Sequence, residues 1–380
     1  MRIQSKLPEV GTTIFTVMSQ LAHEHHAINL SQGFPNYAID PELKDLVNHY
    51  VQHDYNQYAP MAGVMELREA IANKKKVCYQ VDIDPVDEVT ITSGATEALY
   101  AAIAAVIHKG DEVIIFEPAY DSYIPAILLN GGIPRPIRLK SPDYKIDWQE
   151  VTDMMNDRTK MIIINTPNNP TGTILTKDDI LTLQQITADS DILILSDEVY
   201  QHLVYDGEQH QSVLLYPELY KRSVIAMSFG KTFHATGWRI GYVIAPPSIT
   251  REIRKVHQFN TFSINRPVQH ALADYLKQPS RYLSLPSFFE AKRDLFAEAI
   301  SSSRFEVFKS HGTYFMLASY KAITNEDDQT FARRMTREHG VAVIPISSFY
   351  SDDTDEGIIR FCFAKTDDLL LAAAEKIIKI

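Results

Sequence analysis

A lysine, a serine and an arginine lie within one short stretch of the chain, residues 228–239. Lys231 follows the hydrophobic run 224–227, with Ser228 just before it and Arg239 eight residues after it. A lysine that is partly removed from water near other cations has a lowered pKa and can act as a nucleophilic amine. Arginine stays charged and offers a planar fork that suits a phosphate. These residues are what an enzyme needs to use pyridoxal 5'-phosphate (PLP), an aldehyde that carries a phosphate.

Two polar turns can contribute to a site for this cofactor. Residues 92–97 (TSGATE) join a predicted strand to a predicted helix, and small side chains there let N–H groups at the helix N-terminus approach a phosphate. Residues 165–172 (NTPNNPTG) follow a hydrophobic run and can present an amide to a ligand at the carboxyl end of a strand. Each turn alone is also typical of an ordinary loop. The two turns support a cofactor site because they occur in the same chain as Lys231.

A carboxylate and a phenol follow another hydrophobic run. Asp197 lies at the end of the hydrophobic run DILIL (191–195), at the edge of a predicted buried strand where an unpaired carboxylate is costly. Its partner is either a protonated pyridine nitrogen, as in PLP, or a structural arginine or lysine, and taken alone the residue favours the structural partner. Tyr200, three residues further on, can bring a phenol to the same place.

Hydrophobic runs that alternate with helical patterns predict the scaffold for these residues. The runs are not strictly alternating with polar residues, which indicates strands buried on both faces of a mostly parallel sheet. We therefore expect an α/β fold with a mostly parallel, doubly covered sheet and a smaller α+β domain. The predicted strands of the sheet lie in residues 89–92, 112–116, 160–165, 191–200 and 223–230.

Two domains are expected from the change of pattern along the chain. Residues 40–278 form the predicted large, PLP-binding α/β domain. Residues 1–39 and 279–380 together form the predicted small domain, because the C-terminal part mixes long helical patterns with short strands. The amphipathic segment 13–26 is expected to pack onto the small domain and the cleft.

Composition excludes several classes of partner. The chain has 380 residues, 45% of them hydrophobic, and a net charge of -11 with acidic and basic residues interspersed, which argues against nucleic acid and membrane surfaces. No apolar run reaches the roughly 18 residues of a membrane span, and no signal pattern is evident, so we expect a cytoplasmic protein. Cys78 and Cys362 are too few for a disulfide framework. The histidines of segment 23–26 lack HExxH spacing, and no metal site is predicted.

Taken together, the chain resembles the fold-type I PLP-dependent aminotransferases of the aspartate aminotransferase superfamily. The resemblance covers essentially the whole chain. Within the superfamily, it is most similar to the branch of methionine aminotransferases and kynurenine–oxoglutarate aminotransferases. It rests on the segments INLSQGFPN, NQYAPMAGVMELREAIA, SGATEALYAAI, FEPAYDSY, NTPNNPTG, SDEVY, SFGKTFHATGWRIGY and IIRFCFAK.

The resemblance implies a role at the PLP ring or its aldehyde for five residues. Lys231 would bond to the aldehyde of PLP and, once released, carry a proton from the substrate Cα to the cofactor. Asp197 would keep the ring nitrogen protonated, so that the ring accepts the electrons that the departing proton leaves behind. Tyr200 and Asn169 would hydrogen-bond the ring hydroxyl oxygen, and Tyr120 would stack on the ring.

The resemblance also implies a phosphate site, a substrate site and a dimer. Arg360 would grip the substrate α-carboxylate, with Asn169 beside it, and Gly33 lies where the N-terminal segment of the family covers the substrate. Tyr58 would reach the phosphate in the neighbouring subunit, so a homodimer with shared active sites is implied. The residues expected to bind the phosphate are Gly94, Ala95, Thr96, Ser228, Arg239 and Tyr58.

The implied reaction is a ping-pong transfer of an amino group from an amino acid to a 2-oxo acid. No second arginine can be assigned to a side-chain carboxylate, while Phe15, Tyr58 and Phe262 stand where related enzymes line the side-chain pocket. This favours neutral, sulfur-containing or aromatic substrates such as methionine, phenylalanine, tyrosine or kynurenine. Phe15 and Phe262 are explained equally well as core residues.

Two other functions stay open at this point. A cysteine-conjugate β-lyase could use the same scaffold and cofactor, because function depends on the site and not on the fold. A cofactor-binding regulator or inactive scaffold is the other alternative. The presence of Lys231, Asp197 and Arg360 together argues against loss of activity, and the acidic net charge argues against DNA binding.

Overall fold

The computed structural model describes residues 3–380. The strands of its largest sheet are β2 (Val89–Thr92), β3 (Glu112–Glu117), β4 (Ile133–Arg138), β5 (Thr159–Asn165), β6 (Leu193–Asp197), β7 (Ser223–Ser228) and β8 (Gly241–Ile244). Their order across the sheet is β2-β8-β7-β6-β5-β3-β4. Strands β3 to β7 pair in parallel, whereas β8 is antiparallel to both of its neighbours. The predicted mostly parallel α/β sheet is confirmed.

Strands β4 and β8 are not among the strands predicted from the sequence. Residues 133–138 read IPRPIR, and each proline removes a hydrogen-bond donor from the ladder. Strand β4 tolerates both prolines because it lies at the edge of the sheet. Strand β8 begins with a glycine soon after the turn Thr236–Trp238, so its residues read as part of a loop.

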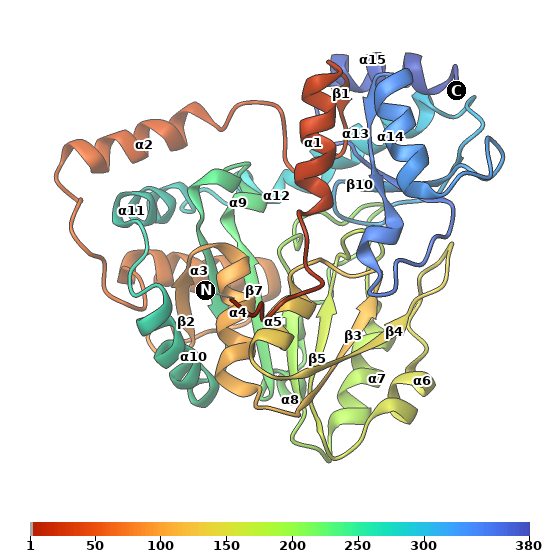
Figure 1. Cartoon of the computed structure of the whole chain (residues 1–380). Coiled ribbons are helices and arrows are strands. Elements are labelled where there is room, and N and C mark those ends of the chain that lie inside the picture. The colour runs from red at the N-terminus through yellow and green to blue at the C-terminus, as the bar shows by residue number, and fades with distance from the viewer. Residues whose placement is uncertain (1–2) are drawn as a thin grey trace.

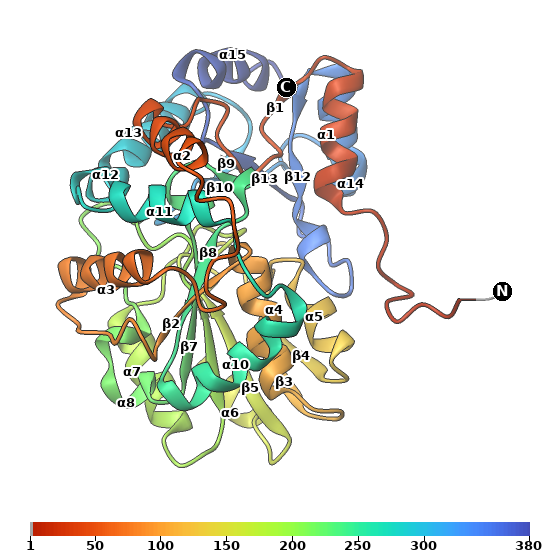
Figure 2. The same ribbon diagram turned by 90° about the vertical axis from the view of Figure 1, so that its left-hand side faces the viewer.

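Helices cover both faces of this sheet, as Figure 2 shows. Neighbouring strand residues face opposite cores: Ile162 packs in one hydrophobic cluster and Ile163 in the other. The helices on one face are α4 (Gly94–Val106), α5 (Tyr123–Leu129) and α10 (Pro247–Asn260). Those on the other face are α3 (Met65–Tyr79), α6 (Trp148–Met154), α7 (Lys177–Thr187) and α8 (Pro217–Tyr220). The double covering explains why the strands are continuously hydrophobic.

Residues 14–29 lie beside the C-terminal part of the chain, above the large sheet (Figure 1). Strand β1 (Ile28–Asn29) pairs in parallel with β11 (Val341–Ala342). A second small sheet has the order β12-β13-β10-β9, with the bounds Ile344–Pro345, Ile358–Cys362, Phe315–Ser319 and Glu306–Val307. The predicted domain boundaries at residues 40 and 278 stay a prediction.

The remaining helices pack against the small sheets, against the helices that cover the large sheet, or at its strand ends. No helix within residues 3–380 is long and apolar enough to cross a membrane. The bounds of these helices are Ile14–Glu24 (α1), Pro41–Gln52 (α2), Phe229–Thr232 (α9), Arg266–Tyr275 (α11), Ser280–Leu283 (α12), Leu285–Ala299 (α13), Asp328–Glu338 (α14) and Asp367–Ile377 (α15).

Side-chain caps mark several of these helix starts. Thr13 caps α1 by accepting a hydrogen bond from the Thr16 N–H. Thr176 and Asp179 form a capping box at the start of α7. A cap satisfies N–H groups that the first helical turn leaves without a partner, so it fixes where the helix begins.

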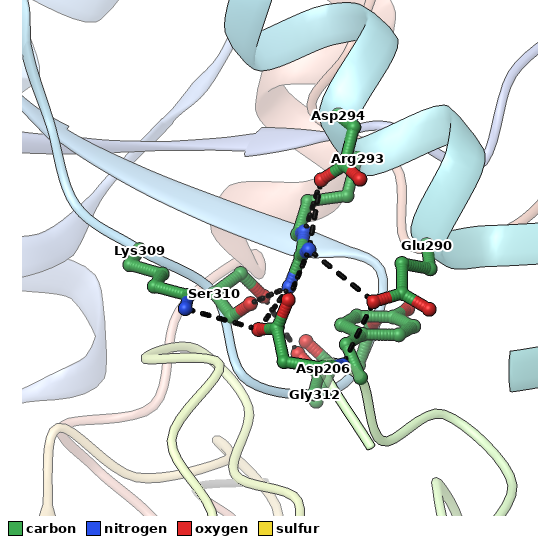
Figure 3. Close-up of polar contacts among 9 residues, drawn as sticks. Asp206, Glu290, Arg293, Asp294, Lys309, Ser310 and Gly312 are labelled. Carbon is green, nitrogen blue, oxygen red and sulfur yellow. Dashed lines mark hydrogen bonds and ion pairs between the residues drawn. The ribbon is translucent and has the colours of Figure 1, made fainter. Parts of the chain in front are cut away.

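An arginine network joins the segment after Tyr200 to the segment that leads into β10 (Figure 3). Arg293, on α13, donates two hydrogen bonds of 2.8 Å to Asp206 and one of 2.9 Å to the Ser310 carbonyl. Lys309 adds a weaker contact of 3.2 Å to Asp206. The two segments also form an isolated bridge between Val204 and Gly312. Arg293 therefore holds together the segment after Tyr200 and the segment just before β10.

We expect Arg293→Met to lower the free energy of unfolding by about 2 kcal/mol, because it leaves charge-assisted hydrogen bonds of Asp206 unmade. The Arg293 guanidinium holds the pKa of Asp206 well below its usual range. A depressed carboxyl pKa stabilises the fold above the unfolded-state pKa of about 4, and this contribution is lost as pH falls further. Urea titrations between pH 3 and 7 should therefore show a shallower acid decline in Arg293→Met.

Lys309→Met is the matched control, since Lys309 contacts the same carboxylate but its side chain is 62% exposed. Its effect on stability should stay within about 0.5 kcal/mol. Equal losses in the two variants, or an unchanged acid limb in Arg293→Met, would contradict the assignment of Arg293 as the main partner of Asp206.

Candidate active site

The carboxyl ends of the central parallel strands bring the predicted polar residues together. Strand β5 ends at Asn165, β6 at Asp197 and β7 at Ser228. In the ladder, Asn165 lies opposite Asp197, and Asp197 opposite Ala226. Because ligand sites of α/β sheets lie at these strand ends, a pocket is expected here.

One pocket opens at this edge and gathers most of the predicted site residues. Those that line it are Phe15, Gly33, Ala95, Thr96, Tyr120, Asn169, Asp197, Tyr200, Ser228, Lys231, Arg239 and Arg360. The lining residues that the sequence analysis does not name as site residues are Gln32, Phe34, Leu99, Asn165, Val199, Thr236 and Phe315. Residues far apart in the chain thus form one site.

Lys231 lies in the single-turn helix α9 directly after β7. Its Nζ donates a hydrogen bond of 3.2 Å to the Gly33 carbonyl and lies 5.8 Å from the centre of the Tyr200 ring. Burial lowers the pKa of Lys231 to about 8, and the nearby Arg360 adds to this effect. An appreciable fraction of the amine is therefore neutral near pH 8 and able to act as a nucleophile or a base.

Asp197 lies buried at the end of β6. One of its carboxylate oxygens accepts a hydrogen bond of 2.7 Å from the Tyr123 hydroxyl, and the other accepts one of 3.3 Å from the Val199 N–H. Burial raises the pKa of Asp197 to about 6. Among the side chains of residues 3–380, no arginine or lysine forms an ion pair with it, so the structural partner that the sequence allowed is not found. A carboxylate in this setting gains from a cationic ligand.

The turn between β2 and α4 faces a guanidinium. Gly94 has a φ of +72°, and a Cβ added there would lie 2.7 Å from Nη2 of Arg239. Arg239 donates 3.1 Å to the Thr236 carbonyl and has no carboxylate partner in the part of the chain that the structure describes. A helix N-terminus and an unpaired arginine at one place make a site for a phosphate.

Arg360 is fully buried in β13. It donates a hydrogen bond of 2.6 Å to the Asn169 side-chain oxygen and one of 3.1 Å to the Ser31 carbonyl. Its Nε has no hydrogen-bond partner, and no carboxylate pairs with it among residues 3–380. The guanidinium lies 3.8 Å from the centre of the Phe315 ring and 5.3 Å from that of Phe15. An unpaired buried cation of this kind is suited to a ligand carboxylate.

Comparison with known proteins identifies the family. The family model described as "Aminotransferase class I and II" matches residues 25–377. The chain belongs to the class I and II aminotransferases. A methionine aminotransferase of Escherichia coli (strain K12) is 50% identical over 375 residues, which cover 98% of this chain and 97% of that protein. A kynurenine–oxoglutarate transaminase of Dictyostelium discoideum is 32% identical, with 97% of this chain and 94% of that protein covered.

Solved structures agree with the family. The structure of YbdL from Escherichia coli, described as having a methionine aminotransferase function, matches with a TM-score of 0.98 and 49% identity, and all of both chains are covered. An N-succinyldiaminopimelate aminotransferase from Mycobacterium tuberculosis matches with a TM-score of 0.94 and 32% identity over 99% of each chain. The aspartate aminotransferase-like fold and the aminotransferase activity that the sequence predicts are confirmed.

The pocket of this aminotransferase fits PLP on three observations. The amine of Lys231 has a lowered pKa, the buried Asp197 lacks a cationic partner within the described residues, and the Gly94 turn leaves no space for a Cβ beside Arg239. These features match an aldehyde, a protonated ring nitrogen and a phosphate, respectively. Tyr120 lines the pocket. Its ring centre lies 5.8 Å from that of Tyr123, whose hydroxyl donates the hydrogen bond to Asp197.

The aminotransferase chain does not bring Tyr58 or Phe262 into its own pocket. Their rings pack against each other with centres 5.4 Å apart, and 79% of Tyr58 is exposed. This arrangement leaves Tyr58 free to contact a second chain, and its role at the phosphate of a neighbouring subunit stays a prediction. Phe15, by contrast, lines the pocket beside Arg360.

Two contacts at the site of the aminotransferase are not predicted from the sequence. Tyr123, whose hydroxyl contacts Asp197, lies three residues after Tyr120 in the quoted segment FEPAYDSY, so the spacing of the two tyrosines is a signal for it. Tyr314 donates a hydrogen bond of 2.6 Å to the same Gly33 carbonyl that Lys231 contacts. Its tyrosine side chain lies in an ordinary strand pattern, which contains no signal for this contact.

Proposed function

We propose that this aminotransferase uses PLP to move an amino group from a neutral, sulfur-containing or aromatic L-amino acid to a 2-oxo acid. The observation that carries the proposal is the joint position of Lys231 and Arg360, an amine of lowered pKa and an unpaired buried guanidinium that line one pocket. An amine can react at the α-carbon side of a substrate whose carboxylate the guanidinium holds.

Asp197, Lys231 and Arg239 have separate tasks in this proposal. When bound, PLP supplies an electron-accepting ring that makes the α-proton of an amino acid acidic. Asp197 would hold the proton on the ring nitrogen, and the Tyr123 hydroxyl keeps the Asp197 carboxylate in place. Lys231 would take the proton from the substrate Cα and pass it to the cofactor, a role that suits an amine with a pKa of about 8. Arg239 and the N-terminus of α4 bind the phosphate.

The cations of the pocket leave none for a charged substrate side chain. In the described chain, the lysines and arginines that line the pocket are Lys231, Arg239 and Arg360, and the proposal uses all three. The rest of the lining includes Phe15, Phe34 and other apolar groups. Because a desolvated, unpaired carboxylate is costly, neutral side chains are favoured. The names of the methionine and kynurenine relatives support this preference.

We also propose a homodimer in which Tyr58 reaches the phosphate of the neighbouring subunit. Support comes from the exposed position of Tyr58 beside Phe262, on a chain whose own pocket it does not enter. The cytoplasmic location stays a prediction of the sequence.

A panel of amino donors tests the substrate class. The PLP-loaded enzyme is mixed with single amino acids, and the change in cofactor absorbance gives the rate of the first half-reaction. We expect methionine, phenylalanine and tyrosine to react at least about 100-fold more efficiently than aspartate, since burying an unpaired carboxylate costs several kcal/mol. Leucine is a control for size without sulfur or an aromatic ring.

Equal rates with aspartate would contradict the proposed pocket. Release of pyruvate from a cysteine S-conjugate without a 2-oxo acid, combined with no reaction of methionine, would favour the β-lyase instead. PLP binding without turnover of any amino acid would favour a regulator or an inactive scaffold.

A further inference from the structure

Residues 31–34, which we call the strap, run along the active-site pocket. Gln32, Gly33 and Phe34 of the strap line the pocket. All four backbone carbonyls of the strap accept hydrogen bonds from side chains of the site or of the C-terminal part. The pairs are Arg360 to Ser31 (3.1 Å), Lys365 to Gln32 (3.3 Å), Tyr314 to Gly33 (2.6 Å), Lys231 to Gly33 (3.2 Å) and Lys365 to Phe34 (2.7 Å).

Two of these donors have another task in the proposed function. Lys231 is the amine that reacts, and Arg360 is the guanidinium that binds the substrate carboxylate. The Lys231 nitrogen gives up N–H groups when it bonds to an aldehyde, so its hydrogen bond to Gly33 is not kept throughout the reaction. During the reaction, the strap therefore depends on the donors that have no other ligand.

Lys365 is one of these donors. It is buried, with 2% of its surface exposed, and no carboxylate pairs with it in residues 3–380. A buried ammonium without compensation is costly. The strap carbonyls at positions 32 and 34 are the hydrogen-bond acceptors that the structure gives it, so Lys365 and the strap stabilise each other.

Tyr314 is the second such donor. Its ring is fully buried against Tyr200, with ring centres 5.2 Å apart, so the hydroxyl has a fixed direction. The strap also packs closely here, since a Cβ added at Gly33 would lie 2.9 Å from the Phe315 ring. Phe315 in turn stacks on the Arg360 guanidinium at 3.8 Å. A shift of Gly33 would therefore disturb both the strap and the substrate arginine.

We propose that Tyr314 and Lys365 are positioning residues that hold the strap over the substrate while Lys231 and Arg360 are engaged. The proposal rests on the proposed function for the tasks of Lys231 and Arg360. The structural part, that these two side chains anchor the strap, does not depend on it.

Hydrogen exchange of the strap tests the anchoring directly. We expect the peptide that covers residues 28–38 to exchange about tenfold faster in Tyr314→Phe, which removes one hydroxyl and keeps the ring. Lys365→Met should show an equal or larger effect. Tyr320→Phe is the matched control, because the buried Tyr320 hydroxyl donates 2.8 Å to the Glu326 carbonyl, away from the strap. The measurement is made on PLP-loaded protein without substrate.

Steady-state kinetics with methionine then tests the effect on substrate. For Tyr314→Phe we expect about a tenfold higher KM with kcat changed less than about threefold, because the loss concerns binding under the strap. Cofactor absorbance and thermal stability should stay close to wild type. A variant that was merely destabilised would lower stability without this split between KM and kcat.

The outcomes separate the two proposals. Wild-type exchange in both Tyr314→Phe and Lys365→Met would overturn the anchoring, whatever the activity. Faster exchange with an unchanged KM would overturn the link to substrate. Absence of turnover in the wild type would contradict the proposed function alone, since the exchange result does not require a reaction.

Discussion

Lys231→Ala is expected to lower the turnover of this aminotransferase by about 10⁴-fold or more, because one side chain supplies both the nucleophilic amine and the proton carrier. The pocket offers no second amine: within the described residues, Lys231 is the lysine that lines it. Tyr200 and Tyr314 lie close, but burial raises the pKa of both phenols, so they are poor bases. Methionine turnover with a 2-oxo acid measures the effect.

The absorbance of lysine-bound PLP should be lost in the same variant, although PLP can still bind through Arg239 and the α4 turn. Lys277→Ala is a suitable control, because Lys277 is exposed and its ion-pair partner in the described residues is Asp274, three residues before it. Transamination by Lys231→Ala at the wild-type rate would contradict the proposed mechanism.

The pH dependence of the free energy of unfolding should reveal the lowered pKa of Lys231 without any measurement of activity. Burial holds the pKa of Lys231 at about 8, below its ordinary value of about 10.4. Between these values the unfolded chain binds a proton that the folded chain does not, so folding gains stability as pH rises. Below pH 8 the wild type carries the full cost of the buried charge. The cofactor-free Lys231→Ala protein should therefore be the more stable one at pH 7, and the difference should shrink towards pH 10.

The sequence predicts the polar centre of the site because that centre is built on strand ends. Asp197 and Ser228 each follow a continuous hydrophobic run, and parallel strands place such ends along one edge. The same reasoning finds the β2–α4 turn with Gly94. These are local patterns whose positions follow from the fold class, so one chain is sufficient to predict them.

The strap and its anchors are not predictable in this way. Tyr314 and Gly33 are 281 positions apart, and the contact uses a backbone carbonyl that any residue would offer. In the sequence, Lys365 is an ordinary lysine that follows a strand. Its side chain is buried only because the strap packs over it in the folded protein. Contacts of this kind depend on how the N-terminal segment packs against the C-terminal part of the chain. No periodic pattern in the sequence indicates that packing.

Tyr58 and β4 show two further limits with physical causes. The exposed ring of Tyr58 has its predicted partner on another chain, so the packing of a single chain gives it no contact at the site. Strand β4 contains two prolines, which local propensity places outside a sheet. Parallel pairing with β3 at the edge outweighs that propensity.

Arg360→Met is expected to lower kcat/KM for methionine by about 10³-fold, because the substrate carboxylate would then be buried without a charged partner. Methionine fills a similar volume and can pack between Phe315 and Phe15, so the apolar cage around the side chain is kept. Arg360→Lys should recover only part of the loss. A lysine keeps the charge but has no fork to contact both a carboxylate and the Asn169 oxygen.

A substrate without a carboxylate separates recognition from general damage. Wild-type enzyme should react with phenylalanine far faster than with phenethylamine, which has the same ring and amine but no carboxylate. If Arg360 binds the carboxylate, Arg360→Met should lose activity with phenylalanine and keep its low rate with phenethylamine, so the preference between the two falls by about 10³-fold. An equal loss with both compounds would mean that Arg360 supports the pocket through Asn169 and Ser31 instead. The unpaired Nε and the absence of a protein carboxylate around Arg360 in residues 3–380 favour the first result.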